Sequence, residues 1–142
     1  MVAGLASLTF IPLLAISMVH LLWAFGLTYP AKDELTLART VAGFRGIEKM
    51  PPKLASFGVA VATFSAGLWA LALTDASSSL VLTGGGVVLA LVFLARGFIG
   101  YTRKWREMTP EEPFATFDKK LYSPLCIGIG TGFLVLTALR LF

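Results

Sequence analysis

Charged side chains are scarce in this sequence of 142 residues: Asp, Glu, Lys and Arg make up only 14% of it. That is about half their share in an ordinary soluble domain. The chain also has a single cysteine, Cys126, and a single histidine, His20. One cysteine excludes an internal disulfide and a Cys-x-x-Cys motif. One histidine cannot bind a b-type haem iron from both sides, so we expect no metal and no cofactor in a single chain.

Motifs of several common enzyme classes are missing as well. The sequence contains no Gly-x-Ser-x-Gly, no Gly-rich phosphate loop followed by Lys, and no His-Glu-x-x-His. These absences count against those classes and leave open whether the protein is an enzyme of another kind. We interpret Cys126 as a buried structural thiol.

Apolar residues, by contrast, are abundant: they form 56% of the chain, and the mean hydropathy is +0.80. Four stretches with few or no charges reach the length of about 20 residues that crosses a hydrocarbon core of roughly 30 Å. Their expected bounds are 3–27, 54–74, 78–102 and 122–141. They fill nearly the whole chain, which predicts an all-α fold, a four-transmembrane-helix bundle in one domain over residues 1–142.

Basic residues gather in two of the three connections between these stretches. The first connection holds Lys32, Arg39, Arg45, Lys49 and Lys53, the third holds Arg103, Lys104, Arg106, Lys119 and Lys120, and the second holds none. The positive-inside rule predicts that both basic loops face the cytoplasm and that both termini lie outside. We attribute the pI of 9.5 to basic residues that orient the protein in the membrane and contact anionic lipid headgroups, and we expect no nucleic-acid partner. We also expect no cleaved signal peptide, because no basic residue precedes the first apolar run.

An amphipathic segment is expected in the first connection. Leu37, Val41, Phe44 and Ile47 repeat there at roughly helical spacing. This pattern predicts a helix that lies on the cytoplasmic membrane surface and ends before the Pro51-Pro52 pair. An ordinary basic, solvated loop is the alternative.

Two segments of the third connection carry signals for the start of a helix. Thr109-Pro110, followed by two acidic residues, is typical of a capped first turn, and Pro113 would keep that helix short. Ser123-Pro124 repeats the pattern, so we predict that the fourth spanning helix begins there with Ser123 as its N-cap. Its exposed amides would suit an anion.

Small residues recur every four positions in three of the spans and predict close helix packing. They are Gly58, Ala62 and Ala66, then Gly86 and Ala90, then Gly128 and Gly132. We expect Gly97 and Gly128 to lie at a close helix contact. Trp23, Tyr101 and Trp105 are the expected anchors at the membrane interface.

The histidine of the first span and the arginine of the third span fall at a similar depth. At about 1.5 Å per residue, His20 lies roughly 9 Å and Arg96 roughly 8 Å from the cytoplasmic ends of their spans. Asp118, Tyr122 and Ser123 enter this layer from the fourth span. We take these five as candidate ligand-binding residues, because an Asp paired with Arg96 or His20 would lower the cost of burying both groups.

Three of these five residues also have a plainer interpretation. Arg96 could extend to a lipid phosphate at the interface. His20 could bond to Ser17 one turn earlier, and Asp118 could pair with a neighbouring lysine at the surface.

Residues 110–126 read PEEPFATFDKKLYSPLC, and residues 23–34 read WAFGLTYPAKDE. Together with the Met-Pro-Pro run that ends the first connection, these segments resemble a bacterial family of small four-helix integral membrane proteins classed as a domain of unknown function. The resemblance covers essentially the whole chain and implies a bacterial inner-membrane protein made of this one domain. It assigns no activity, ligand or catalytic residue to individual positions.

Small size, segregated basic loops and missing catalytic motifs favour a non-catalytic inner-membrane protein that binds a lipid or a partner protein at its cytoplasmic face. The partner could be another membrane protein or a second copy of this chain. The alternative is a membrane-embedded enzyme or small-amphiphile binder with a polar site around His20, Arg96, Asp118 and Tyr122. A channel is less favoured, because a single intramembrane charge gives little polar lining.

Overall fold

The described part of the chain is almost entirely helical. The structure, a computed structural model, describes residues 1–77 and 79–141 and contains no β-strand in those ranges. Four long helices are α1 (Val2–Ala24), α3 (Lys53–Ala72), α4 (Leu80–Ile99) and α7 (Ser123–Leu141). Short helices occupy the first and third connections: α2 (Glu34–Val41), α5 (Arg103–Met108) and α6 (Phe114–Phe117). The predicted all-α bundle is confirmed.

Four helical stretches are long and apolar enough to cross a membrane. They are Val2–Ala24, Lys53–Ala72, Leu80–Ile99 and the continuous stretch Phe114–Leu141. Large apolar side chains lie exposed along all four, as expected where the surroundings are hydrocarbon rather than water. By the length and composition of its helices, the chain is a multi-pass membrane protein.

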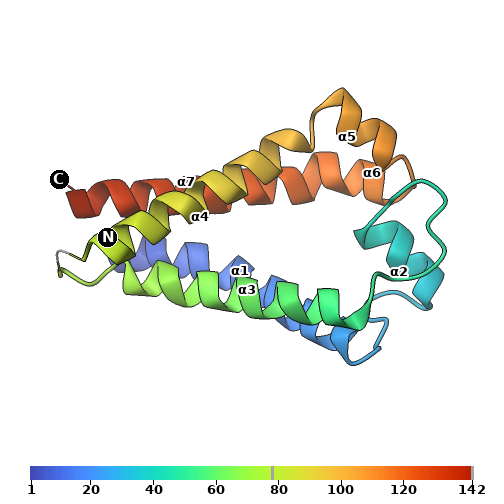
Figure 1. Ribbon diagram of the computed structural model, residues 1–142, viewed down its shortest axis with the longest axis horizontal. Coiled ribbons are helices and arrows are strands. Elements are labelled where there is room, and N and C mark those ends of the chain that lie inside the picture. Colours follow the sequence, from blue (N-terminus) through green and yellow to red (C-terminus); the bar gives the residue numbers. More distant parts are fainter. Residues whose placement is uncertain (78, 142) are drawn as a thin grey trace.

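The long helices associate in two pairs. α1 packs along α3, α4 packs along α7, and the pairs meet mainly through α1 and α7 (Figure 1). Leu13 of α1 and Phe133 and Leu136 of α7 are fully buried between the pairs. Both termini and the α3–α4 connection lie at one end of the bundle, where Arg140 donates hydrogen bonds to the carbonyl oxygens of Leu73 and Asp75. The short helices lie at the opposite end.

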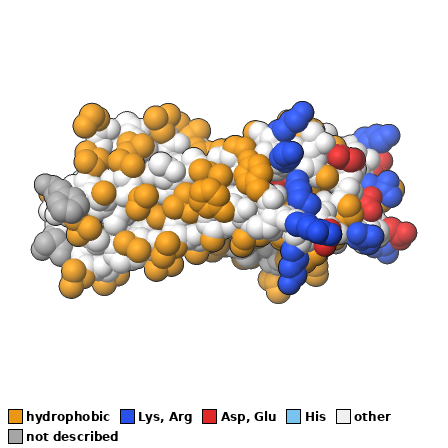
Figure 2. Space-filling view, turned by 90° about the horizontal axis from the view of Figure 1, so that it is seen from above, with side chains coloured by type: hydrophobic (Ala, Val, Ile, Leu, Met, Phe, Trp, Pro, Cys, Tyr) orange, Lys and Arg blue, Asp and Glu red, His pale blue; other side chains and the backbone are white. Residues whose placement is uncertain are grey.

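The charged residues are concentrated at that opposite end. Figure 2 shows lysine and arginine side chains in a band across it, with apolar side chains distributed along the rest of the visible face. The first and third connections, which carry the two basic groups of the sequence, form this end together (Figure 1). We call it the charged end.

The fourth spanning helix does not begin where the sequence predicts. Ser123 is not an N-cap, because the backbone runs from α6 through a π-helical turn, Asp118–Tyr122, directly into α7. The N–H of Ser123 donates to the carbonyl oxygen of Asp118. Pro124 lacks an N–H and would crowd a carbonyl of the preceding α-helical turn, which the wider π turn relieves. The helix start predicted to suit an anion is therefore absent from this described stretch.

The third connection also differs from the prediction. Thr109 ends α5, and its hydroxyl donates to the carbonyl oxygen of Trp105 at 2.9 Å. The next helix, α6, begins only after Pro113, and Glu112 accepts a hydrogen bond from the N–H of Thr116 at 3.1 Å. A residue that precedes a proline is pushed towards extended backbone, so neither Thr109 nor Glu112 continues a helix.

The helix in the first connection is shorter than the expected amphipathic segment. Asp33 caps it by accepting a hydrogen bond from the N–H of Thr36 at 2.7 Å, and this bond lowers the pKa of Asp33. The cap therefore stabilises α2 above the ordinary pKa of aspartate and is lost as the pH falls through the lowered value. Leu37 is buried, but Phe44 is exposed, because Gly43 at φ +62° ends the helical repeat. That the segment lies on a membrane stays a prediction.

Close packing of α4 on α7 depends on glycines. A Cβ atom added to Gly97 would lie 2.9 Å from the carbonyl oxygen of Ser123. One added to Gly130 would lie 2.8 Å from the backbone nitrogen of Leu94. These neighbours are backbone atoms that cannot turn aside, so the predicted close contact at Gly97 is confirmed.

The same prediction is wrong for Gly128. A Cβ atom there would meet nothing within 4 Å, and the same holds at Gly58. Gly132, one turn along the same face as Gly128, contacts Thr9 of α1. α1 and α7 diverge towards the charged end (Figure 1), so one face of α7 is packed at Gly132 and open at Gly128.

Candidate functional site

A fully buried carboxylate lies at the charged end, where α4, α5 and the π turn meet. Asp118 has an exposed fraction of 0%. Its Oδ1 accepts hydrogen bonds from Nη2 of Arg96 at 2.7 Å and from Oγ of Ser123 at 3.3 Å. Its Oδ2 accepts from Nη2 of Arg106 and from Nε1 of Trp105, both at 2.8 Å. We call these five residues the Asp118 cluster.

The two arginines of the cluster are not equivalent. Nη1 of Arg106 donates to the carbonyl oxygen of Ala115 at 2.7 Å, so this guanidinium has a second acceptor. Arg96 lies with its guanidinium carbon 4.9 Å from the Trp105 ring centroid, within the range of a cation–π contact. Its Nη1 is buried and has no hydrogen-bond partner among the described residues.

The structure brings together three of the five candidate residues, Arg96, Asp118 and Ser123. Asp118 pairs with arginines rather than with a neighbouring lysine. Sequence reasoning placed Arg106 among the loop charges and Trp105 at the membrane interface, and it missed both as partners of Asp118. Their separation from Asp118 by 12 and 13 residues fits no helical spacing, so the sequence held no signal for the contact.

His20 lies outside this cluster. Its Nδ1 is 2.8 Å from the carbonyl oxygen of Ile16, and its ring centroid is 4.6 Å from that of Trp23. The expected bond to Ser17 is not formed, because the Ser17 hydroxyl donates to the carbonyl oxygen of Ala60 on α3 at 2.7 Å. His20 therefore bonds within its own helix, and Ser17 joins α1 to α3.

Tyr122 connects the π turn to the first connection. Its hydroxyl donates to the carbonyl oxygen of Thr40 in α2 at 3.1 Å. Its ring centroid lies 5.7 Å from that of Phe114 in α6. Tyr122 thus holds α2 and α6 together over the space between the helix pairs.

That space is a cavity of about 390 Å³. Four of the side chains that line it carry an ionisable group: His20, Arg96, Tyr122 and Cys126. Most of the other described lining residues are aliphatic or aromatic, and α2 and α6 contribute Val41 and Phe114 at the charged end. The cavity therefore brings the histidine of α1 and the arginine of α4 to one apolar chamber. Its described lining residues include no Asp or Glu.

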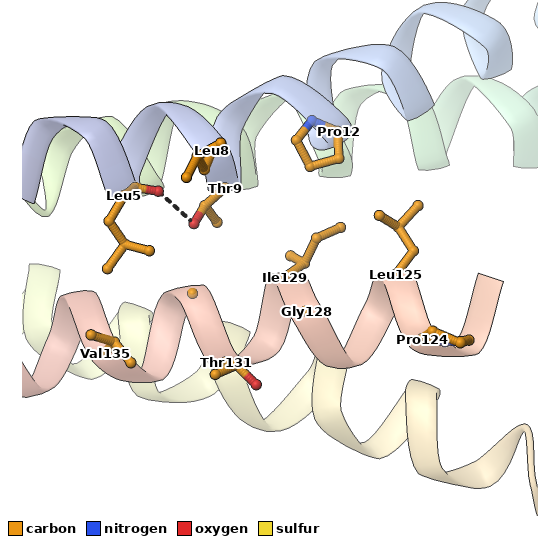
Figure 3. Close-up of a pocket in the computed structure, with 11 residues that line it drawn as sticks. Leu5, Leu8, Thr9, Pro12, Pro124, Leu125, Gly128, Ile129, Thr131 and Val135 are labelled. Atoms are coloured by element: carbon orange, nitrogen blue, oxygen red, sulfur yellow. Dashed lines mark hydrogen bonds between the residues drawn. The ribbon is translucent and has the colours of Figure 1, made fainter. Parts of the chain in front are cut away.

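A second hollow, of about 500 Å³, runs between α1 and α7. In Figure 3, Leu5 of α1 and Ile129 of α7 project into it from opposite sides, beside the open position at Gly128. The hydroxyls of Thr9 and Thr131 both donate to carbonyl oxygens of their own helices. Its described lining is thus almost wholly apolar, and we call it the outer groove.

The expected interface anchors differ in exposure. Tyr101 is 46% exposed, and its hydroxyl donates to the carbonyl oxygen of Lys119 at 3.0 Å. Trp23 is buried and donates through Nε1 to the carbonyl oxygen of Tyr29 at 2.7 Å. The indole of Trp105 donates to Asp118, as described. Of the three, only Tyr101 presents much surface to its surroundings.

Comparison with known proteins identifies one related family. A family model described as "Protein of unknown function (DUF3995)" matches residues 13–133. The matched range includes the whole Asp118 cluster and every residue that lines the cavity. No curated protein and no solved structure matches the chain.

Proposed function

The chain belongs to this family of proteins of unknown function, and from its geometry we propose that it is a non-catalytic membrane protein that binds a lipid-like amphiphile in the cavity. The observation that supports the proposal is the composition of the cavity wall. That wall is largely apolar, yet it includes His20, Arg96 and Tyr122. Pockets for small ligands combine mostly apolar walls with a few fixed polar groups in this way.

The walls of the cavity also extend to the outer surface of the bundle. Leu121 and Val59 both line the cavity, and they are 55% and 40% exposed. In a membrane, these side chains would contact lipid, so an acyl chain could reach the cavity from the bilayer without crossing water. This path favours an amphiphile over a water-soluble ligand.

Binding is favoured over catalysis by the hydrogen bonds of the polar residues. Both oxygens of Asp118 are occupied by donors, and two arginines hold it. His20 is bonded to its own helix rather than to Asp118. A general acid–base pair needs its two groups within hydrogen-bond reach of the reacting atoms, but His20 lines the cavity and Asp118 is not among its described lining residues.

We further propose that the charged end faces the cytoplasm of a bacterial inner membrane, where its basic residues contact anionic headgroups. Alkaline phosphatase, which is active only outside the cytoplasm, tests this orientation. Fused after Leu141, it is expected to be active; inserted between Met50 and Pro51, it is expected to be inactive. The opposite pattern would contradict the proposed orientation.

The single cysteine offers a direct test of amphiphile binding. Cys126 lines the cavity, so a bound amphiphile should shield it from N-ethylmaleimide. We expect dodecanoate or dodecanol, added to delipidated protein in phosphatidylcholine nanodiscs, to slow alkylation of Cys126 several-fold. Mass spectrometry of the intact chain measures the rate.

The control moves the thiol out of the cavity. Cys126→Ser combined with Gly128→Cys places the only thiol in the outer groove, two residues along α7 at an open position (Figure 3). Its alkylation should be slowed much less. Equal slowing at the two positions would mean that the amphiphile partitions into the bilayer generally, and the proposed function would fail.

A further inference from the structure

The charge beside the cavity indicates which amphiphile it binds. Resting on the proposed function, we infer that the ligand has an anionic head, a carboxylate or a phosphate, bound at Arg96. Two arginines (+2) and one aspartate (−1) give the Asp118 cluster a net charge of +1. The side chains of Arg96 and Arg106 are only 33% and 25% exposed, so this excess charge is largely withdrawn from solvent and favours an anion nearby.

Both arginines of the cluster have a buried donor with no acceptor in the described part of the chain, Nη1 of Arg96 and Nε of Arg106. Arg106 donates both to Asp118 and to the carbonyl oxygen of Ala115. Arg96 donates to Asp118 through Nη2 alone, and its buried Nη1 lacks an acceptor in the described part of the chain. Arg96 also lines the cavity, whereas Arg106 does not. Of these two unused donors, only that of Arg96 belongs to a residue that lines the cavity.

The rest of the described wall does not neutralise this charge. Among the described lining residues there is no Asp or Glu. Tyr122 already donates its proton to the carbonyl oxygen of Thr40 and has no second proton for an anion, so the preference for an anion depends on Arg96. A cationic head would meet the guanidinium and no acidic side chain, whereas a carboxylate or phosphate would form a charge-assisted hydrogen bond with Arg96.

The volume of the cavity selects a small ligand. About 390 Å³ lies near the lower end of the range for small-molecule pockets. We therefore assign the cavity to one acyl chain and its head. The matching probes are amphiphiles that each have a single alkyl chain.

The experiment compares dodecanoate, dodecyl phosphate, dodecanol and dodecylammonium, which share one chain and differ in the charge of the head. Each is titrated against alkylation of Cys126 in neutral nanodiscs, and the Cys126→Ser/Gly128→Cys chain corrects for partitioning into the bilayer. We expect the anions to reach half-protection at concentrations about tenfold lower than dodecanol, as one charge-assisted hydrogen bond provides. Dodecylammonium should be the weakest.

The outcomes separate the inference from the proposed function. Equal protection by dodecanol and the anions, or stronger protection by dodecylammonium, overturns the inference and leaves amphiphile binding intact. Protection by none of the four overturns both. The more effective of the two anions identifies the head, that of a fatty acid or of a single-chain phosphate ester, and either result supports the inference. Protection by inorganic phosphate at the concentration of dodecyl phosphate would overturn the need for an acyl chain.

A variant of Arg96 gives a second, independent measurement. Arg96→Gln should abolish the difference in half-protecting concentration between the anions and dodecanol, both measured on this variant; a difference that persists at full size would contradict binding of the head at Arg96. Thermal unfolding shows whether this chain is folded. If it is not, the series on the natural chain decides the inference alone.

Discussion

Replacing Asp118 with alanine is expected to lower the free energy of unfolding by about 3–5 kcal/mol, the usual cost of removing one partner from a buried ion pair. The loss arises because Arg96 and Arg106 keep their charges in a place where the carboxylate no longer balances them. The indole N–H of Trp105 loses its acceptor as well. Unfolding of the purified protein in a mild detergent, followed by circular dichroism, measures the change.

Glu107→Ala is the matched control. Glu107 pairs with Arg103 at 2.7 Å, the same distance as Arg96 and Asp118, but the side chains of that pair are 58% and 92% exposed. We expect a change below about 1 kcal/mol, because exposed ion pairs contribute little. Similar losses of unfolding free energy in the two variants would mean that burial of Asp118 does not determine how much this residue contributes to stability.

A third variant separates pairing from packing. Asp118→Leu combined with Arg96→Met and Arg106→Met removes all three charges at once. Replacing a buried charged group by apolar side chains of similar volume is often neutral or stabilising. We expect this chain to recover much of the stability lost in Asp118→Ala. No recovery would show that the hydrogen bonds of the cluster matter more than its charges.

Gly97→Leu is the second change expected to be severe, with a loss of about 3 kcal/mol, the upper end of the usual cost of overpacking. Its side chain would have to displace Ile127 and the carbonyl oxygen of Ser123, so α4 and α7 would separate next to the Asp118 cluster. The same substitution at Gly128 should cost little, because that position faces the open outer groove (Figure 3). The two unfolding curves, measured side by side, give the comparison. Equal losses would contradict the packing described for α4 and α7.

The four spans and the position of the basic loops could be predicted because both follow from local composition. A long apolar run has few alternatives to a spanning helix. With four spans, the first and third connections must share one end. Counting depth along the helices likewise placed Arg96 and Asp118 in one layer, and the structure pairs them.

The contacts of the third connection could not be predicted in this way. Arg106 and Trp105 reach Asp118 only because the chain turns between α5 and α6, and no periodic pattern encodes that turn. The error at Gly128 has a different cause. Its spacing from Gly132 correctly marks one face of α7, but the distance to α1 along that face depends on how the helix pairs diverge, which spacing does not record.

The π turn has a consequence for the angular phase of the last helix. In an α-helix, residues five apart differ by roughly 140° around the axis, on different faces. Asp118 and Ser123 are five apart, yet the wider turn between them brings the Ser123 hydroxyl to 3.3 Å from Oδ1 of Asp118. The π turn thus adds one residue to a helical turn, which changes the side of the helix on which the following residues lie. It lets one helix direct Asp118 towards Arg96 and still present Gly130 to α4.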